Sequence, residues 1–219
     1  TCFNFSLSSL FNFLKSTLVS FAVTTTLFAG NYAIDTSLSN ANFTVKHLKV
    51  TNVTGTFNDM SGNFEYDEET NKLKSLKGEI VVSSINTADE KRDEHLKSED
   101  ILNVKKFPKI FFKSTKIEDN IVYGDLTIRN VTKNIKLELE NQAFLDKQVI
   151  FSMKGETKRS YFDISWDELL ETGSIAVSDE IKLTINIKGN LVEEPKPEEK
   201  KEDKKKTNKK VTEKKKETK

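Results

Sequence analysis

The sequence predicts an all-β fold, an eight-stranded antiparallel barrel with one short surface helix. Apolar and polar residues alternate with a period of two through much of residues 31–192, as at 125–129 and 180–188. This alternation is typical of antiparallel strands that have one face in the core and one in water. Turn-forming residues separate the runs, as at 118–120. Strands that follow one another in hairpin order around one dry face favour a closed barrel over a sandwich.

The first 30 residues form a separate segment. Lys15 is their only charged residue, and a mostly apolar run follows it over 16–29. This run is short for a transmembrane helix, which needs about 20 apolar residues. A basic residue, an apolar run and small residues at 29–30 together predict that residues 1–30 are a secretory signal peptide. An uncleaved leader that anchors the protein in the membrane is the alternative.

Nine segments carry the strand pattern, and they count as about eight strands because one boundary between them is open. The segment 53–66 is expected to bend or break near Asp59, where turn-forming residues interrupt it. The interior of an eight-stranded barrel either fills with side chains or holds one small ligand, and periodicity leaves both possibilities open. The expected strands are 31–36, 40–50, 53–66, 76–86, 109–118, 121–130, 134–145, 148–164 and 179–191.

One segment departs from the alternation. Thr87 and Glu90 have the spacing of a capping box, in which the two side chains satisfy each other's end of a new helix. The helix is expected over about 88–98, nearly all charged, with Leu96 as its apolar anchor. Residues 101–102 are then expected to dock it on the rim of the barrel.

Charged residues dominate 193–219, which contain 12 Lys and 8 acidic residues. No face of this segment can be buried, so a solvated tail without ordered structure is expected. Residues 204–219 carry a net charge of +7, from nine Lys and two Glu. This charge predicts attachment to an anionic envelope surface, with a simple solvated spacer as the alternative.

Composition argues against several classes of protein. The chain has 35 Lys and Arg against 34 Asp and Glu, so it lacks the positive field of a nucleic-acid binder. His47, His95 and Cys2 are too few for a Cys/His zinc site, and no metal is predicted. The chain has no Gly-x-Ser-x-Gly elbow or phosphate loop, so no catalytic residue, cofactor or enzymatic activity is predicted. A carboxylate-based enzyme is the alternative that remains.

Two further charged residues of the expected helix, Arg92 and Asp93, are interpreted as a contact that fixes the helix to the rim of the barrel. A surface ion pair that contributes little to stability is the alternative.

Several motifs in 31–191 resemble those of the YceI-like, or polyisoprenoid-binding, family. The run 92–96 is very close to the family's Arg-Asp-x-His-Leu signature. Two positions depart from the family pattern: Leu38 stands in place of a His, and 148–151 stand where many members have Arg-x-Gly-Phe. Both departures remove a polar group, so a different head-group preference is expected. The matching positions are 32–35, Ser39, 43–48, Val53, Gly55, Phe57, 84–87, 91–98, 107–115 and 124–132.

The resemblance implies an extended, lipocalin-like barrel over 31–192 that buries a long isoprenoid chain, and export to the periplasm. Its ligand would be a polyisoprenoid or prenylated quinone, held for storage, shielding or transport. A non-enzymatic envelope scaffold or adhesive protein, tethered through 204–219, is the alternative, and homodimer formation is left open. The inward-facing residues proposed to bind the ligand, which would otherwise fill a closed core, are Phe43, Val45, Phe57, Phe64, Phe112, Leu126, Ile128, Phe151 and Phe162.

Overall fold

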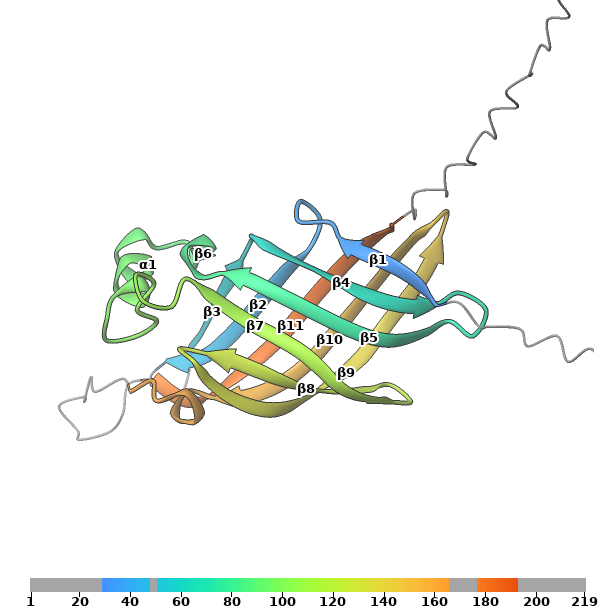
Figure 1. Cartoon of the computed structure of the whole chain (residues 1–219). Helices are drawn as coiled ribbons and strands as arrows, with labels where there is room; N and C mark the ends of the chain where they lie inside the picture. The colour runs from blue at the N-terminus through green and yellow to red at the C-terminus, as the bar shows by residue number, and fades with distance from the viewer. Residues whose placement is uncertain (1–28, 48–50, 166–176, 193–219) are drawn as a thin grey trace, which may run out of the picture.

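The computed structural model describes residues 29–47, 51–165 and 177–192, which form one closed antiparallel β-barrel with a short helix at one end (Figure 1). The leader prediction, apart from its last two residues, and the tail prediction fall on 1–28 and 193–219, outside the described residues. Among the described residues, no helix has the length and apolar character needed to cross a membrane.

The described residues contain eleven β-strands, one α-helix and two 3-10 helices. In chain order they are β1 (Gly30–Ile34), β2 (Asn40–His47), β3 (Thr51–Phe57), β4 (Met60–Asp67), β5 (Lys72–Val81), η1 (Val82–Ser84), β6 (Ile85–Asn86), α1 (Glu90–Lys97), β7 (Lys109–Glu118), β8 (Ile121–Ile128), β9 (Val131–Leu145), β10 (Gln148–Lys158), η2 (Arg159–Phe162) and β11 (Val177–Leu191).

Eight strands form the closed ring, in the order β1-β4-β5-β7-β8-β9-β10-β11, and β11 closes it by pairing with β1. β11 also pairs with β2, so β1 and β2 are two halves of one interrupted strand. In the same way, β3 and β4 form a second interrupted strand, and β5 and β6 form a third, with η1 between them. The eight-stranded prediction is therefore confirmed, and the extra predicted segment reflects the interruption between β1 and β2.

Two of these three interruptions have clear local causes. Between β1 and β2, the carboxylate of Asp35 accepts hydrogen bonds from the backbone N–H and the hydroxyl of Ser37, which forms a turn without reversing the chain. Between β3 and β4, the break comes at Asn58 and Asp59, as predicted. The backbone N–H of Asp59 donates to the hydroxyl of Ser84 in η1. Both interruptions let long strands bend around the barrel.

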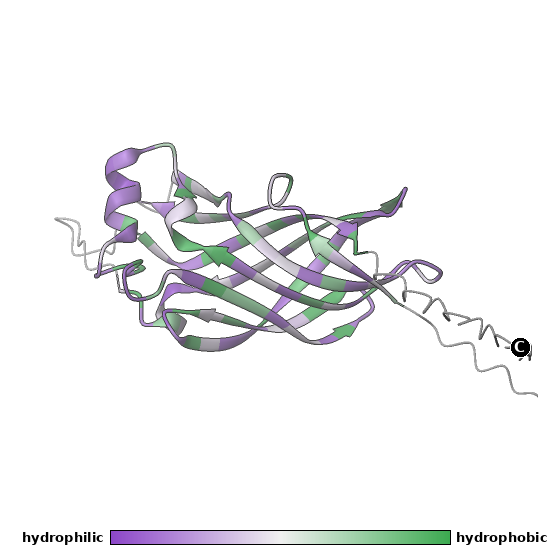
Figure 2. Ribbon diagram, turned by 45° about the horizontal axis from the view of Figure 1, so that its top comes forward, coloured by the Kyte–Doolittle hydropathy of each residue, from purple (hydrophilic) through white to green (hydrophobic). Residues whose placement is uncertain are grey.

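Alternation along the strands builds the core. In β9, Ile135, Leu137 and Leu139 are buried, and the intervening Lys136 and Glu138 are exposed, because successive side chains point to opposite faces. Figure 2 shows hydrophobic and hydrophilic residues alternating along the ribbons, with α1 mostly hydrophilic. The barrel therefore has a dry interior and a wet outer surface.

Several strand ends differ from the prediction, most clearly in three strands. The expected strand 148–164 ends at Lys158, where the chain enters η2. β5 begins at Lys72, before the expected start at residue 76, and gives way to η1 after Val81. β11 begins at Val177, two residues before its expected start. Contacts across the barrel set these ends, and the alternation of apolar and polar residues along one strand gives no information about such contacts.

The start of the helix also differs. α1 begins at Glu90, and its N-cap is Asp89, whose side chain accepts a hydrogen bond from the backbone N–H of Arg92. The predicted capping box between Thr87 and Glu90 is therefore wrong. Asp is itself a strong N-cap residue, and the hydroxyl of Thr87 is bonded to side chains farther along the helix.

Candidate functional site

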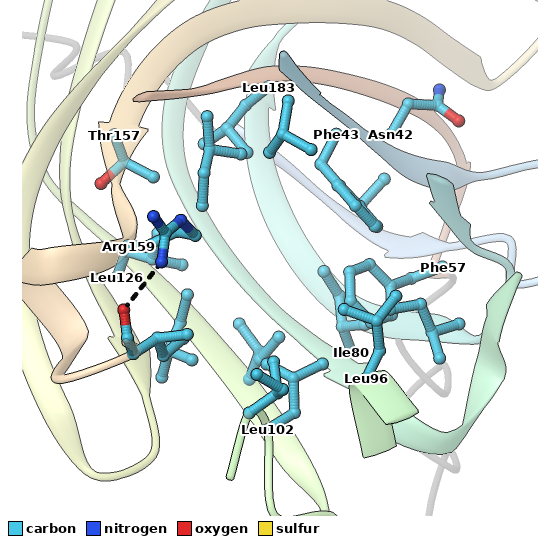
Figure 3. Close-up of a pocket in the computed structure, with 18 of the residues that line it drawn as sticks. Asn42, Phe43, Phe57, Ile80, Leu96, Leu102, Leu126, Thr157, Arg159 and Leu183 are labelled. Atoms are coloured by element: carbon cyan, nitrogen blue, oxygen red, sulfur yellow. Dashed lines mark hydrogen bonds between the residues drawn. The ribbon is translucent and has the colours of Figure 1, made fainter. Parts of the chain in front are cut away.

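The interior of the barrel is open at the end that carries α1. An apolar cavity of about 170 Å³ lies there, enclosed by strands on several sides and covered in part by Leu96 of α1 (Figure 3). Phe43, Phe57 and Leu126 are among the strand residues that line it. Asn42 is also beside it, but its side chain points away from the cavity in Figure 3.

A second apolar cavity of about 60 Å³ continues toward the other end of the barrel. Phe112, Leu76 and Met153 help to line it. The two cavities share wall residues from four strands, so they follow one another along a single channel. The shared residues are Ile80, Ile110, Leu126, Leu183 and Ile185.

The outer end of the channel meets a third, more polar cavity of about 380 Å³, which we call the mouth. It shares Phe43, Val45, Leu96 and Val177 with the first cavity. The mouth is therefore the side from which a molecule would reach the channel. Its polar and charged lining residues are His47, Thr87, Asp89, Lys91, Arg92 and His95.

Two phenylalanine rings lie against glycines of neighbouring strands. A Cβ at Gly55 would come within 2.3 Å of Cζ of Phe43, and a Cβ at Gly124 within 2.3 Å of Cζ of Phe112. Only a glycine leaves room for a ring in this position. The rings therefore pack on the wall of the barrel rather than across the channel.

The opposite end of the channel is filled by an aromatic cluster, which we call the closed-end cluster: Tyr32, Phe64, Tyr66 and Phe151. All four side chains are fully or almost fully buried. The ring of Phe64 stacks on Tyr32 with centroids 5.3 Å apart and meets Phe151 edge-on at 5.1 Å. Tyr32 meets Tyr66 edge-on at 6.2 Å. These offset and edge contacts are the favoured geometries of aromatic pairs.

Polar groups secure the closed end. The hydroxyl of Tyr32 donates to Glu68 at 2.5 Å, and burial together with this bond raises the pKa of Tyr32 well above its usual value. The carboxylate of Asp67 accepts from the backbone N–H groups of Glu69 and Thr70. These bonds, with Thr70 the strongest influence and the nearby ammonium of Lys74 adding to it, lower the pKa of Asp67 to about 2. Asp67 is therefore ionised at neutral pH, and it orders the turn between β4 and β5.

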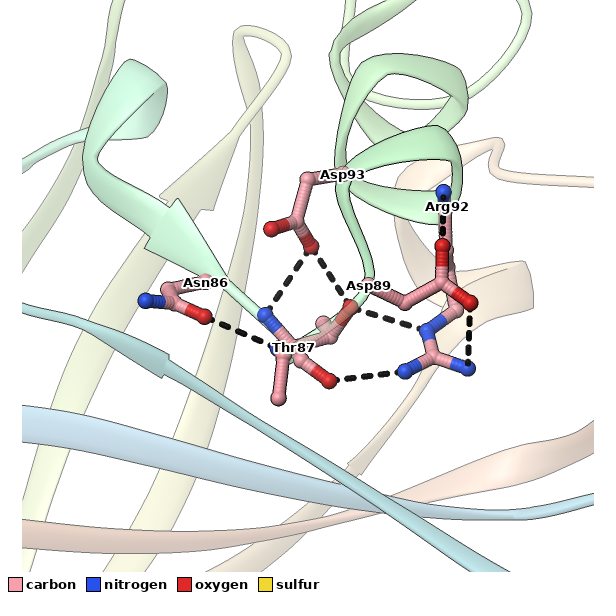
Figure 4. A network of polar contacts seen from close by, with 6 residues as sticks. Asn86, Thr87, Asp89, Arg92 and Asp93 are labelled. Atoms are coloured by element: carbon pink, nitrogen blue, oxygen red, sulfur yellow. Dashed lines mark hydrogen bonds and ion pairs between the residues drawn. The ribbon is translucent and has the colours of Figure 1, made fainter.

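A polar network holds α1 to the rim of the mouth (Figure 4). Asp93 accepts from both the backbone N–H and the hydroxyl of Thr87, at 2.9 and 2.5 Å. Arg92 donates from Nε to the hydroxyl of Thr87 and from Nη2 to its carbonyl, at 2.8 and 2.7 Å. The interpretation of Arg92 and Asp93 as a contact that fixes the helix is confirmed. Ile101 and Leu102 are buried beside it, which confirms their docking role.

Arg159 borders the first cavity and was not anticipated from the sequence. Its guanidinium donates to three backbone carbonyls, those of Ile164, Val177 and Ser178, at 2.9–3.2 Å. These bonds join the end of β10 to the start of β11 beside the mouth. The nearby hydroxyl of Thr157 is buried and has no hydrogen-bond partner within the described part of the chain. No periodic signal separates Arg159 from the other basic residues of the sequence.

The nine predicted ligand-binding residues occupy four places. Phe112 lines the second cavity, Phe64 and Phe151 belong to the closed-end cluster, and Phe162 is buried in η2. Their contact with a ligand stays a prediction. The remaining five, which line the first cavity, are Phe43, Val45, Phe57, Leu126 and Ile128.

The prediction omitted aliphatic residues that also form the channel wall, such as Ile80, Ile110, Leu183 and Ile185. Like the predicted residues, they occupy the inward-facing positions of their strands, so the alternation of apolar and polar residues was sufficient to predict them. Across the described ranges, no three His, Cys, Asp or Glu side chains come together in a group that could hold a metal ion. What the arrangement offers chemically is a dry channel with a polar mouth, suited to a molecule with an apolar tail.

Comparison with known families gives a match over almost the whole barrel. Residues 32–189 match the family model described as the YceI-like domain. The chain is 34% identical over 190 residues to protein YceI of Salmonella newport (strain SL254), a match that covers 81% of this chain and 96% of that protein.

Two solved structures share the fold. The YCEI protein of Campylobacter jejuni is 32% identical, with a TM-score of 0.58 over 68% of this chain and 90% of that one. A polyisoprenoid binding domain from Saccharophagus degradans, implicated in plant cell wall breakdown, is 15% identical, with a TM-score of 0.56 over 75% of this chain and 99% of that one. The second likeness is one of fold alone.

Proposed function

The chain belongs to the YceI-like family, and we propose that it is an exported lipid-binding protein that holds the apolar tail of an isoprenoid lipid or a prenylated quinone in its barrel. There it would store, shield or carry the lipid through the periplasm. The observation that carries the proposal is the series of two apolar cavities behind a polar mouth. The polyisoprenoid-binding domain with the same fold supports the choice of ligand class.

The physics of the channel fits such a tail. A prenyl tail consists of methyl, methylene and alkene groups, which need a dry wall and no hydrogen-bond partners. Each methylene group transferred from water into an apolar site contributes about 0.8 kcal/mol. A channel lined by aliphatic and aromatic residues can therefore bind a tail firmly, while the mouth leaves a polar head group in contact with water.

The test is native mass spectrometry of the protein purified from its native compartment without detergent, followed by lipid extraction. We expect a mass excess that resolves into a prenyl lipid on denaturation, carried by a chain that begins near residue 30. Failure to recover a prenyl lipid, together with no binding of added isoprenoid to the purified protein, would contradict the proposal.

Two variants of β11 sharpen this test, because neighbouring residues of a strand face opposite sides. Leu183 lines both cavities, whereas Lys182 is exposed. We expect Leu183→Trp to fill the channel and to reduce the amount of co-purified lipid by about tenfold or more, since a tail loses several buried methylene groups. Lys182→Trp should retain the lipid. Equal loss in both variants would mean that the channel is not where the lipid binds.

A further inference from the structure

Exposed apolar side chains gather at one end of the barrel. Seven large hydrophobic residues in the described part of the chain are exposed. Four of them lie on the hairpin of β9 and β10 or directly after β11, and we call this group the apolar tip: Phe144, Leu145, Ile150 and Val192. Single exposed apolar residues are common on soluble proteins, whereas a group of them marks a surface that meets another molecule or a membrane.

Backbone contacts bring the members of the apolar tip together. The backbone N–H of Leu191 donates to the carbonyl of Lys147, in the turn between β9 and β10, at 3.0 Å. Val192, the next residue, therefore lies beside this turn. Leu145 is the last residue of β9 and borders the same turn, and Ile150 is the third residue of β10. In Figure 1 the turn and the end of β11 lie at the end of the barrel away from α1.

The core does not account for the apolar tip, because its side chains project from both faces of the hairpin. Register partners in neighbouring strands point to the same face of a sheet. Phe144 is the partner of the buried Val149 and points inward at the rim, whereas Ile150 is the partner of Lys188 and points outward. Leu145 is 72% exposed. Since the end of a hairpin in water is expected to be polar, these residues indicate a contact with something other than water.

The sequence beyond Val192 indicates what this contact is. Residues 204–219 carry a net charge of +7 and follow a connection of eleven residues, 193–203. A chain spans at most about 3.6 Å per residue, so the basic segment begins within about 40 Å of the apolar tip. β11, with 15 residues at about 3.3 Å each, is itself about 50 Å long. An anionic lipid surface that binds the basic segment therefore lies closer to the apolar tip than to the mouth.

The apolar tip and the basic segment have complementary effects on a membrane. A few apolar side chains give only marginal attachment, and stable anchoring generally takes a second signal such as a polybasic segment. The turn of the hairpin is electrically neutral, since Asp146 and Lys147 balance each other. The basic segment would therefore supply the attraction to anionic lipid, and the apolar tip would supply the insertion.

We propose that the apolar tip is a membrane-docking surface, which enters the interface of an anionic membrane while residues 204–219 bind the lipid head groups. The inference goes beyond the proposed function and does not depend on what the channel holds. It places the barrel with the closed-end cluster toward the lipid and the mouth in water.

The first experiment measures binding of the full chain to vesicles of phosphatidylcholine and phosphatidylglycerol in equal parts. We expect Leu145→Ser combined with Ile150→Thr to weaken binding by about tenfold or more, because several methyl and methylene groups no longer leave water. Phe111→Ser is the matched control, since Phe111 is 46% exposed on β7, which does not pair with β9, β10 or β11. The control should change the affinity by less than about twofold.

A second measurement separates insertion of the apolar tip from attachment through the tail alone. A fluorescent dye is attached at Leu145→Cys in a chain that also carries Cys2→Ser, so that the dye has one site. Lipids with bromine on their acyl chains should quench this dye when the protein binds the vesicles, because an inserted apolar face reaches the boundary of the acyl chains. The same dye at Phe111→Cys should keep its fluorescence.

Three results would overturn the inference. Vesicle binding without quenching at Leu145→Cys, and without loss in the double variant, would mean that the tail alone attaches the protein. A dimer of the wild-type chain in solution that the double variant dissociates, with vesicle binding unchanged, would make the apolar tip an interface between copies. Failure of the wild-type chain to bind these vesicles would exclude attachment through either part. The thermal transition checks the folding of each variant, and Leu145→Ser alone replaces the double variant if the latter unfolds.

Discussion

Thr87 joins the barrel to its only described α-helix through four hydrogen bonds, which involve its N–H, its carbonyl and its hydroxyl. The hydroxyl donates a hydrogen bond to Asp93 and accepts one from Arg92, so it acts as both donor and acceptor. The residue is 5% exposed, and water cannot easily replace these partners. Thr87 therefore helps to hold α1 at the rim of the mouth through both its backbone and its hydroxyl group.

We expect Thr87→Val to lower the free energy of unfolding by about 1–3 kcal/mol, because the change removes the hydroxyl that Nε of Arg92 donates to and one of the two hydrogen bonds that Asp93 accepts from Thr87. Chemical denaturation measures this loss. Thr54→Val is the matched control, since Thr54 shares a hydroxyl bond with Thr44 on the exposed face of β3. A loss for Thr87→Val no greater than that of the control would contradict the role assigned to the network.

At the scale of the elements, the open channel depends on how phenylalanines of one strand lie over glycines of another. The register pairs Phe43 of β2 with Gly55 of β3, and the ring occupies the space that a side chain at Gly55 would take. The ring of Phe112 in β7 likewise lies over Gly124 of β8, although the register partner of Phe112 is Leu126. The rings contribute apolar surface to the wall without crossing the channel.

We expect Gly55→Ala to turn the ring of Phe43 into the first cavity and to weaken isoprenoid binding by about tenfold, because the added methyl group overpacks the wall. Binding of a two-unit isoprenoid alcohol measures the effect. Addition of Phe43→Leu to this variant should restore most of the affinity, since the smaller side chain leaves room for the methyl group.

Gly78→Ala is a comparison at another glycine of the channel wall, because Gly78 lines the second cavity and a Cβ there would have no neighbour closer than 3.8 Å. This variant should keep a thermal transition like that of the wild-type chain. If Gly55→Ala bound the probe as tightly as the wild-type chain does, the glycine would not be what keeps the channel open.

These elements also show how far the sequence could predict the structure. The alternation in segments such as 134–145 was sufficient for eight strands, because every strand has one dry face. The interruption between β1 and β2 was counted as a strand boundary, since the turn at Asp35 has turn-forming residues but does not reverse the chain. The N-cap was misplaced because Thr87 finds its partners in the helix side chains Arg92 and Asp93, which a local motif does not include.

The candidate site was less predictable than the fold, for a physical reason. The alternation along a strand identifies which residues face inward. Phe43, beside open space, and Phe64, inside the closed-end cluster, both occupy inward-facing positions, so the alternation cannot distinguish them. The difference between them comes from which glycine each ring covers and what lies beyond it. Those neighbours are set by register across the barrel, including the approach of Phe64 in β4 to Gly189 in β11. The sequence of a single strand contains no information about that approach.

At the scale of the whole molecule, α1 and the points where the described barrel begins and ends lie at opposite ends of the barrel (Figure 1). α1 and the mouth are at one end. Gly30 and Val192 are at the other, where the backbone N–H of Val192 donates to the carbonyl of Asn31. The segment that follows Val192 therefore leaves the barrel at the end opposite the mouth.

This arrangement gives the basic tail a testable role. We propose that residues 204–219, with a net charge of +7, attach the protein to an anionic membrane surface, where each Lys contributes about 1 kcal/mol. The chain should sediment with vesicles that contain anionic lipid, and release should follow a rise in salt, which shortens the range of electrostatic attraction. Deletion of 204–219 should abolish sedimentation and leave the thermal transition of the barrel unchanged.

Neutral vesicles are the control, and they should not bind the full chain. Sedimentation that survives both the deletion and high salt would assign attachment to another surface. If the prediction holds, a fluorescent isoprenoid bound in the channel should stay accessible to a soluble quencher while the protein is on the vesicle, because the mouth lies at the end of the barrel opposite Val192. Protection of the probe on vesicle binding would instead mean that the mouth itself meets the membrane, and that lipid enters the channel directly from the bilayer.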